Sequence, residues 1–269
     1  MRQGIDRENR ELLERLHRGV KGPFTPAQAA EILALDLRRT WRFLSYLSSR
    51  GWLSRVRRGL YTTVPLGADR PSEWREDAWV VAQSVFSPCY VGGFSACEHW
   101  TLTEQIFRDV VIVTARPLRA RKMEVQGTAF LLKMRPKEKL FGTKSVWRGE
   151  IKVQVSDPTR TVVDILDDPA LGGGIRHVSQ VLKAYLEGEH RDEGKLIEYA
   201  DRLGNRTVFK RLGYLVEALG IEAPDLSRRC RTLKSAGLTF LDPTVRAKGR
   251  INKRWNLRVN ARISAEEPA

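Results

Sequence analysis

The sequence predicts an α+β protein: an N-terminal winged helix-turn-helix, then a mixed α/β domain that ends in a helical region and a late strand. Three observations lead to this prediction. Two short helical patterns meet at a tight turn near residue 35, and a hairpin pattern follows them. Short β-branched apolar runs then alternate with helical patterns, and the last third carries apolar residues at three- and four-residue spacing.

The chain of 269 residues is long enough for two domains. The segment 65–71, PLGADRP, holds two prolines and a glycine and is typical of a linker. We therefore divide the chain into a winged helix-turn-helix of residues 1–70 and a second domain of residues 71–269. Each domain has apolar residues for a core of its own, so we expect each to fold alone.

Capping residues mark the helix-turn-helix, which follows a first helix over residues 6–18. Thr25 precedes Pro26, a pair typical of a first helical turn, because the hydroxyl accepts from a free amide and proline has none to satisfy. Asp36 is a second N-cap, so the turn between the two helices is short. Gly51 then permits the second helix to end.

The second helix divides into two sides when it is wound at about 100° per residue. We expect one side to be core: Leu37, Trp41, Leu44 and Leu47, with Phe43 at its margin. The opposite side carries guanidinium and hydroxyl groups, which reach base edges and phosphates in a major groove. These candidate DNA-binding residues are Arg38, Arg42, Ser45 and Ser49, flanked by Arg39 and Tyr46.

Residues 52–64 predict a two-stranded wing with Gly59 near its tip. Arg57 and Arg58 precede this glycine, and Arg55 lies on the first strand, so cations lie where a phosphate or minor groove would be. The order helix, tight turn, basic helix and basic hairpin favours a reader of double-stranded DNA over a merely solvated surface.

Charge supports a polyanionic partner, since 47 Lys plus Arg against 32 Asp plus Glu leave a net charge of +15. No run of about 18 apolar residues is present and the N-terminus is charged, so we expect a cytoplasmic protein without a membrane partner. Cys89, Cys97 and Cys230 have no close paired spacing, which predicts buried thiols rather than a disulfide framework or a zinc site.

The second domain alternates strands and helices before it becomes helical. Asp157 followed by Pro158 is a further N-cap. The expected strands span 109–114, 128–133 and 150–156, and a late strand over 254–260 should return to their sheet. The expected helices span 74–85, 94–99, 158–166, 175–188, 193–203, 207–219 and 224–235.

A second basic segment lies near the C-terminus, where residues 205–262 hold 14 Lys plus Arg against 4 Asp plus Glu. It suits DNA flanks, RNA or an acidic partner, and a solvated surface remains the alternative. The candidate residues are Arg228, Arg229, Lys248, Arg250, Lys253 and Arg254.

Signals for catalysis are weak. Asp109 begins an apolar strand and Glu150 lies two residues before Lys152, a spacing that some metal-dependent nucleases use but that exposed strands also show. Gly172 to Gly174 lacks the rest of a phosphate-binding loop, so it predicts a hinge. We expect His99 to be packed rather than a ligand. No catalytic residue, metal ligand or cofactor is expected, and the protein is interpreted as a non-enzyme.

Four segments of the second domain resemble the AbiEi family, the antitoxins of type IV toxin-antitoxin systems, which are linked to abortive infection of phage-infected bacteria. They are YVGGFSACEHW at 90–100, LTEQI at 102–106, VQVSDPTRTVVD at 153–164 and WNLRVN at 255–260. The likeness extends over nearly the whole chain and includes the winged helix-turn-helix.

The resemblance implies a repressor that acts on its own operon through the N-terminal domain. It further implies that the second domain, with or without the first, opposes a nucleotidyltransferase-like toxin, without need of a stable complex. It also implies two copies on an inverted repeat, since one winged helix covers too short a site to be selective. The basic residues near the C-terminus are then the candidates for antitoxicity. A ligand-sensing winged-helix transcription factor is the alternative.

Overall fold

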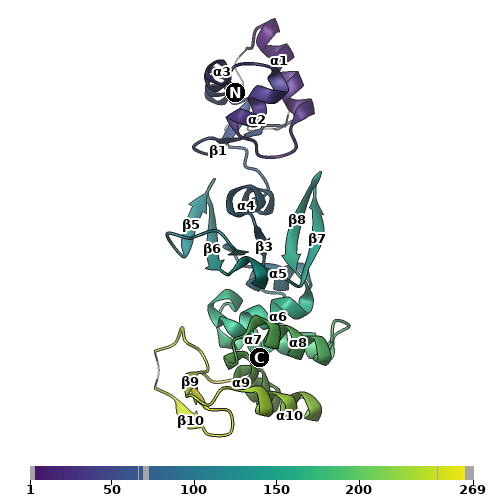
Figure 1. Cartoon of the computed structure of the whole chain (residues 1–269), viewed down its shortest axis with the longest axis vertical. Coiled ribbons are helices and arrows are strands. Elements are labelled where there is room, and N and C mark those ends of the chain that lie inside the picture. Colours follow the sequence, from purple (N-terminus) through teal and green to yellow (C-terminus); the bar gives the residue numbers. More distant parts are fainter. Residues whose placement is uncertain (1–3, 66, 69–72, 247, 264–269) are drawn as a thin grey trace.

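The computed structural model describes residues 4–65, 67–68, 73–246 and 248–263. Three parts follow one another along the longest axis (Figure 1): three helices with a small hairpin, then a six-stranded sheet around a central helix, then a helical part with a small sheet. The predicted order of an α-helical and hairpin domain before a mixed α/β domain is confirmed.

Local capping builds the N-terminal part as predicted. Thr25 accepts from the amide of Gln28 and Asp36 from the amide of Arg39, so each helix of the helix-turn-helix has its cap. Ala34 makes the turn between them in the left-handed region. The elements are α1 (Arg7–Gly19), α2 (Pro26–Leu33), α3 (Leu37–Ser49), β1 (Leu53–Arg57) and β2 (Leu60–Thr63).

The buried side of α3 differs from the prediction. Leu37 and Trp41 are 51% and 40% exposed, although the helical pattern places both in the core. Leu44 and Leu47 are buried as predicted, and Phe43 and Thr40 complete the buried side in place of Leu37 and Trp41. Periodicity shows which residues share a side of a helix, but two neighbouring apolar stripes compete here, and only packing against the other helices decides between them.

The central sheet has the strand order β5-β6-β4-β3-β8-β7 and mixes parallel with antiparallel pairs. The predicted strands 109–114, 128–133 and 150–156 correspond to β4, β6 and β8, whereas β3, β5 and β7 are short or polar and escape prediction. The strands are β3 (Cys89–Val91), β4 (Val110–Thr114), β5 (Lys122–Val125), β6 (Thr128–Met134), β7 (Thr143–Arg148) and β8 (Ile151–Ser156).

Helix α4 (Ala78–Phe86) lies across one side of this sheet between the two hairpins (Figure 1) and buries most of its side chains. It starts after Asp77, so Trp74 lies outside the helix that the sequence predicts from residue 74. Helix α5 (Gly93–His99) follows β3 directly.

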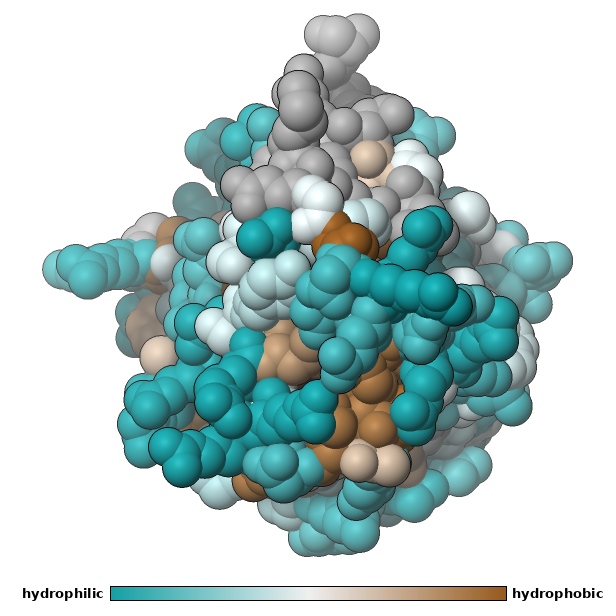
Figure 2. All heavy atoms as spheres, turned by 90° about the horizontal axis from the view of Figure 1, so that it is seen from above, coloured by the Kyte–Doolittle hydropathy of each residue, from teal (hydrophilic) through white to brown (hydrophobic). Residues whose placement is uncertain are grey.

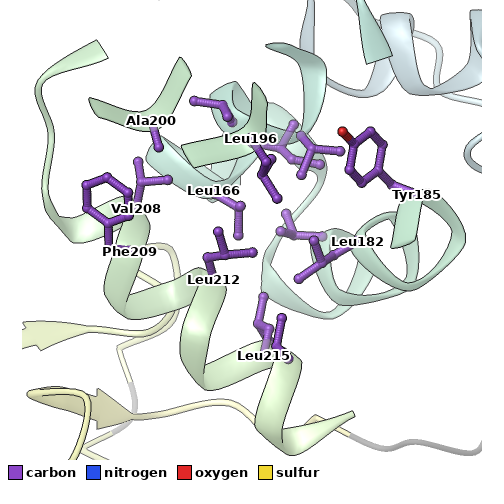
Figure 3. Close-up of a cluster of buried hydrophobic side chains, with 14 of the residues drawn as sticks. Leu166, Leu182, Tyr185, Leu196, Ala200, Val208, Phe209, Leu212 and Leu215 are labelled. Atoms are coloured by element: carbon purple, nitrogen blue, oxygen red, sulfur yellow. The ribbon is translucent and has the colours of Figure 1, made fainter. Parts of the chain in front are cut away.

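The predicted helical region is confirmed and packs around one apolar core. Figure 3 shows side chains of several helices converging there, among them Leu166, Leu182, Leu196 and Leu212. The helices are α6 (Pro158–Asp167), α7 (Ile175–Glu187), α8 (Glu193–Leu203), α9 (Thr207–Ala218) and α10 (Pro224–Leu233), with short 3-10 turns at η1 (Lys137–Lys139) and η2 (Pro169–Gly172).

The late strand forms, but it does not return to the central sheet. It is β11 (Leu257–Val259), which pairs with β10 (Arg250–Asn252) and β9 (Thr239–Phe240) in a separate three-stranded sheet. Trp255 precedes the strand and is fully buried against Gly213 of α9. Alternation along a sequence predicts a strand but carries no information on its partner.

The two predicted domains touch over a defined junction. Val56 and Leu60 of the wing belong to the same apolar cluster as Trp79 of α4. The turn of each neighbouring hairpin adds a polar contact: Gln126 donates to Ser54 Oγ at 2.9 Å, and Lys21 lies 3.7 Å from Glu150. Part of the predicted linker, residues 66 and 69–71, lies outside the described residues.

Candidate nucleic-acid interface

The outward side of α3 presents free cations. Arg38, Arg42 and Ser45 are exposed, and within the described part of the chain neither arginine side chain has an ion pair or hydrogen bond. The helix positions them because its opposite side is anchored by Leu44 and Leu47, which are fully buried. Two guanidinium groups one helical turn apart are thus available to an external anion.

The flanking residues of α3 already have partners inside the chain. Arg39 forms an ion pair with Glu8 of α1 at 3.0 Å, which is exposed and easily exchanged for another anion. The hydroxyl of Ser49 donates to the carbonyl of Tyr46 at 2.8 Å, and the Tyr46 ring lies 4.7 Å from the guanidinium of Arg50. These side chains form the border of the exposed basic row.

The wing adds three exposed arginines, Arg55, Arg57 and Arg58, and none of their guanidinium groups forms an ion pair with another described residue. Gly59 makes the tip, where its φ of +74° would strain any side chain. Trp41 of α3 lies near this tip, with its ring edge toward Tyr61 at 6.4 Å. The sequence pattern does not reveal this position of Trp41, because the residue also fits an apolar stripe.

Seen from the N-terminal end, hydrophilic side chains surround a strip of hydrophobic ones (Figure 2). The described residues of this domain include two exposed large hydrophobic side chains, Leu37 and Trp41. A helix after a tight turn, a row of unpaired arginines and a basic hairpin together provide what a major-groove reader with a wing requires.

Residues 11–64 match the AbiEi family. The matching model is described as "Transcriptional regulator, AbiEi antitoxin", and the matched segment runs from α1 to the end of the wing. The resemblance noted in the sequence is therefore confirmed for this AbiEi segment. The motifs at 90–106, 153–164 and 255–260 lie outside that match.

A solved structure shares the fold along almost the whole chain. The RV2827C protein from Mycobacterium tuberculosis superposes with a TM-score of 0.66, covering 95% of this chain and 92% of that one at 13% sequence identity. The likeness extends the shared fold beyond the AbiEi segment. No curated protein matches the sequence.

The motif DPTRTVVD at 157–164 is a buried structural cluster. The guanidinium of Arg160 donates to Asp164 at 3.0 Å and to the hydroxyl of Tyr90 at 2.9 Å, and that hydroxyl donates to Asp164 at 2.7 Å. Burial, followed by the charge of Asp164, raises the pKa of Tyr90, so the phenol stays protonated. The cluster joins β3 to α6. This structural role accounts for an arginine and an aspartate in the motif, and no catalytic role is needed to explain them.

Asp109 and Glu150 do not meet. Strand β4 runs antiparallel to β3 and β8 runs parallel to it, so the starts of β4 and β8 lie at opposite ends of the sheet. Asp109 pairs with Lys122 at 2.8 Å, and Lys152 lies over the Trp147 ring at 4.9 Å. The described residues hold no group of three His, Cys, Asp or Glu side chains suited to a metal. The nuclease arrangement is not formed.

His99 and the three cysteines are packed as predicted. His99 lies between the rings of Trp79 and Trp100, with centroids 5.4 Å and 4.5 Å away. The three cysteines are free and buried, and burial raises the pKa of Cys89 to about 12. Gly174 stands before α7, where the amide of Ile175 donates to Asp242 at 2.8 Å, so this helix start already has its anion.

The C-terminal basic residues occupy two surfaces rather than one. Arg228 and Arg229 lie on α10, whereas Arg250 lies on β10, and Figure 1 places these elements apart at the end of the molecule. Arg228 pairs with Asp225, and Arg254 pairs with Glu217 at 3.0 Å. Of the six candidates, Arg229, Lys248, Arg250 and Lys253 are exposed and have no anionic partner among the described residues.

One open hollow of about 390 Å³ bears on the ligand-sensing alternative. It lies beside β6 and is lined by Arg119, Arg121 and Lys133 among others. Asp168 already neutralises two of these, at 2.6 Å from Arg121 and 2.8 Å from Lys133. The hollow therefore gives little specific support to a small-molecule sensor. Within the described residues, every helix is too short or too polar to cross a bilayer.

Proposed function

We propose that the protein is a DNA-binding transcriptional repressor of its own operon and the antitoxin of a type IV toxin-antitoxin system. One observation supports the DNA-binding part above others. Arg38 and Arg42 project from the outer side of α3 with no partner in the described chain, beside a wing tip that carries Arg57 and Arg58. Cations left unpaired on a helix-turn-helix are what a polyanion would neutralise.

In this proposal α3 enters a major groove, where Arg38 and Arg42 contact guanine edges and Ser45 adapts to a base or phosphate. Arg55, Arg57 and Arg58 lie along the neighbouring phosphates or minor groove, while Arg39, Tyr46 and Ser49 border the contact. Two copies bind an inverted repeat, because a single recognition helix reads too few base pairs to be selective.

The second domain is proposed to oppose a nucleotidyltransferase-like toxin, without need of a stable complex. Support comes from the description of the matching family and from the exposed cations of the C-terminal part. Arg228, Arg229, Lys248, Arg250, Lys253 and Arg254 are the proposed antitoxicity residues. Residues 1–70 and 71–269 are proposed as the units that carry repression and antitoxicity.

Footprinting on the DNA upstream of its own gene tests the repressor. We expect two protected half-sites related by inversion, and protection should disappear with Arg38→Ala combined with Arg42→Ala at fixed salt. Arg7→Ala is the matched control, since Arg7 is exposed on α1 and pairs only with Glu11 among the described residues. Unchanged operator affinity in the double variant would rule out α3 as the reader.

Rescue of cells that express the neighbouring toxin gene tests the antitoxin. The fragment 1–70 should bind operator but fail to rescue, and charge reversal at Lys248 and Arg250 should weaken rescue while operator binding by the full chain persists. Because the fragment exposes Val56 and Leu60 of the wing, the same fragment with Val56→Ser controls for aggregation. Full rescue by residues 1–70 would assign protection to repression alone.

A further inference from the structure

The small C-terminal sheet has one covered and one open side. Leu257 and the neighbouring Trp255 are fully buried toward α9, and the indole N–H of Trp255 donates to Glu217 at 2.6 Å. The opposite side faces outward. Register places Ile251, Arg258 and Phe240 opposite one another on β10, β11 and β9, so these three side chains form a row on that side.

This row exposes an aromatic ring and an aliphatic side chain to solvent. Phe240 is 46% exposed and Ile251 is 54% exposed, and Leu238 next to the sheet is exposed as well. The guanidinium of Arg258 lies 5.7 Å from the centre of the Phe240 ring. It also donates to the carbonyl of Lys248 at 3.2 Å, so the cation is held beside the ring before anything binds.

Charge around the row is almost all positive. Residues 237–262 contain seven Lys or Arg and one acid, Asp242. Asp242 is buried and accepts from the amides of Ile175 and Thr244 at 2.8 Å, so it does not offset the cations outside. Below the sheet, burial and then the charges of Lys234 and Arg211 lower the pKa of Lys210, in keeping with a positive local field.

The segment 242–245 after β9 is tied to Asn260 after β11, which holds this end of the sheet together. The side-chain amide of Asn260 donates to the carbonyls of Asp242 and Val245 at 2.7 Å and 2.8 Å, and its oxygen accepts from the amide of Asp242 at 3.0 Å. This segment therefore has less ordering entropy to lose on binding.

We propose that this open side of the sheet, the Phe240 row, binds single-stranded nucleic acid. Unpaired bases stack on Phe240 and on the guanidinium plane of Arg258, while Arg250 and Lys253 contact the phosphates. A duplex presents phosphates but keeps its base faces covered, so it leaves Phe240 and Ile251 unused. An acidic protein would also meet the cations, but an exposed aromatic ring with a guanidinium beside it favours exposed bases.

The proposal builds on the basic surface proposed above for antitoxicity, yet it needs neither the toxin nor the operator to be known. Its readout is the affinity of a defined oligonucleotide for the full chain. If the Phe240 row does not bind single strands, the outcomes of footprinting and rescue stay as they are. If footprinting or rescue fails, the affinity of the full chain for a single-stranded oligonucleotide can still be measured.

The test is fluorescence anisotropy of the full chain with a labelled 12-nucleotide RNA, the same sequence as single-stranded DNA, and the DNA duplex. We expect both single strands to bind and Phe240→Ala to weaken them by about 5- to 150-fold, the usual loss for one stacked base. Phe240→Tyr should retain binding. Phe240→Leu should lose it, because leucine keeps the apolar volume but not the plane. A preference between RNA and DNA then reports contacts to the 2′-hydroxyl.

Two matched controls accompany these variants. Ile106→Ala removes an exposed hydrophobic side chain far from the sheet in sequence, and Arg38→Ala with Arg42→Ala disables the proposed reader of duplex DNA. Ile106→Ala should leave single-strand affinity unchanged, and the double arginine variant should weaken it far less than Phe240→Leu does, since it removes only general attraction to phosphates. Thermal unfolding of Phe240→Leu should match that of the parent chain.

Three outcomes would overturn the proposal. Undiminished affinity of Phe240→Leu would show that no base stacks there. Loss of single-strand binding in the Arg38 and Arg42 variant would place the site on the winged helix. Competition by a polyglutamate peptide that is equal to competition by the unlabelled strand would assign the surface to an acidic protein partner.

Discussion

The indole of Trp41 meets the ring of Tyr61 edge-on, with 6.4 Å between their centroids, and so joins α3 to the wing on the outside of the helix rather than in its core. Gly59 lies beside this contact, where an added Cβ would be 3.8 Å from the indole. Helix α3 and the wing tip are thereby held at one relative position, as the proposed DNA-binding surface requires.

Replacing Trp41 should affect binding more than stability. Trp41→Ala should lower the free energy of unfolding by about 1–2 kcal/mol, because 40% of the residue surface is already in solvent. Leu44→Ala, on the buried side, should cost about 2–5 kcal/mol. Urea denaturation measures both, and operator affinity should fall for Trp41→Ala while its fold persists. Equal destabilisation by the two variants would place Trp41 in the core after all.

The wing should act through phosphates. Arg57→Ala and Arg58→Ala should each reduce the slope of log affinity against log salt by about 1, with little change in preference among operator sequences. Binding isotherms at several salt concentrations measure the slope, with Arg7→Ala as the reference. An unchanged slope together with altered sequence preference would mean that the wing reads bases.

The buried imidazole of His177 predicts a pH dependence of stability. Its Nδ1 lies 2.6 Å from the carbonyl of Gly172 and therefore carries the proton, while Nε2 accepts from the hydroxyl of Thr103 at 2.7 Å. Burial lowers the pKa of His177 below its ordinary value of 6.5. As the pH falls, the unfolded chain binds a second imidazole proton at a higher pH than the folded chain does. The stabilisation present above about pH 6.5 is therefore lost as the pH falls.

His177→Gln should flatten part of this dependence when urea unfolding is compared between pH 8 and pH 5. His99 contributes a further part of the pH dependence, because burial and then the charge of Arg148 lower its pKa as well. Were the slope of the variant as steep as that of the parent chain, His177 would not be the group that titrates.

Gly213 should be intolerant of a side chain. A Cβ there would lie 2.0 Å from the ring of Trp255, which is fully buried beneath the small sheet and has no room to retreat. Gly213→Ala should therefore destabilise the chain by about 1–3 kcal/mol, the usual cost of overpacking. Gly237→Ala is the control, since no atom lies within 4 Å of its added Cβ. Differential scanning calorimetry measures both, and similar unfolding temperatures would contradict the packing.

Local chemistry determined much of the AbiEi segment. The caps at Thr25 and Asp36 and the hairpin around Gly59 depend on contacts within a few residues, so the sequence by itself determined them. The same holds for Asp157, whose carboxylate accepts from the amide of Arg160 at 2.8 Å as an N-cap.

Tertiary structure decided what depends on distant parts of the chain. Either Trp41 or Thr40 could lie on the buried side of α3. Packing within the N-terminal core buries Thr40 and leaves Trp41 partly exposed. The strand at Leu257 pairs with β9 and β10 because Trp255 docks on α9, which alternation could not reveal. The row of Ile251, Arg258 and Phe240 exists only through that pairing, since strand register brings together residues that sequence spacing keeps apart.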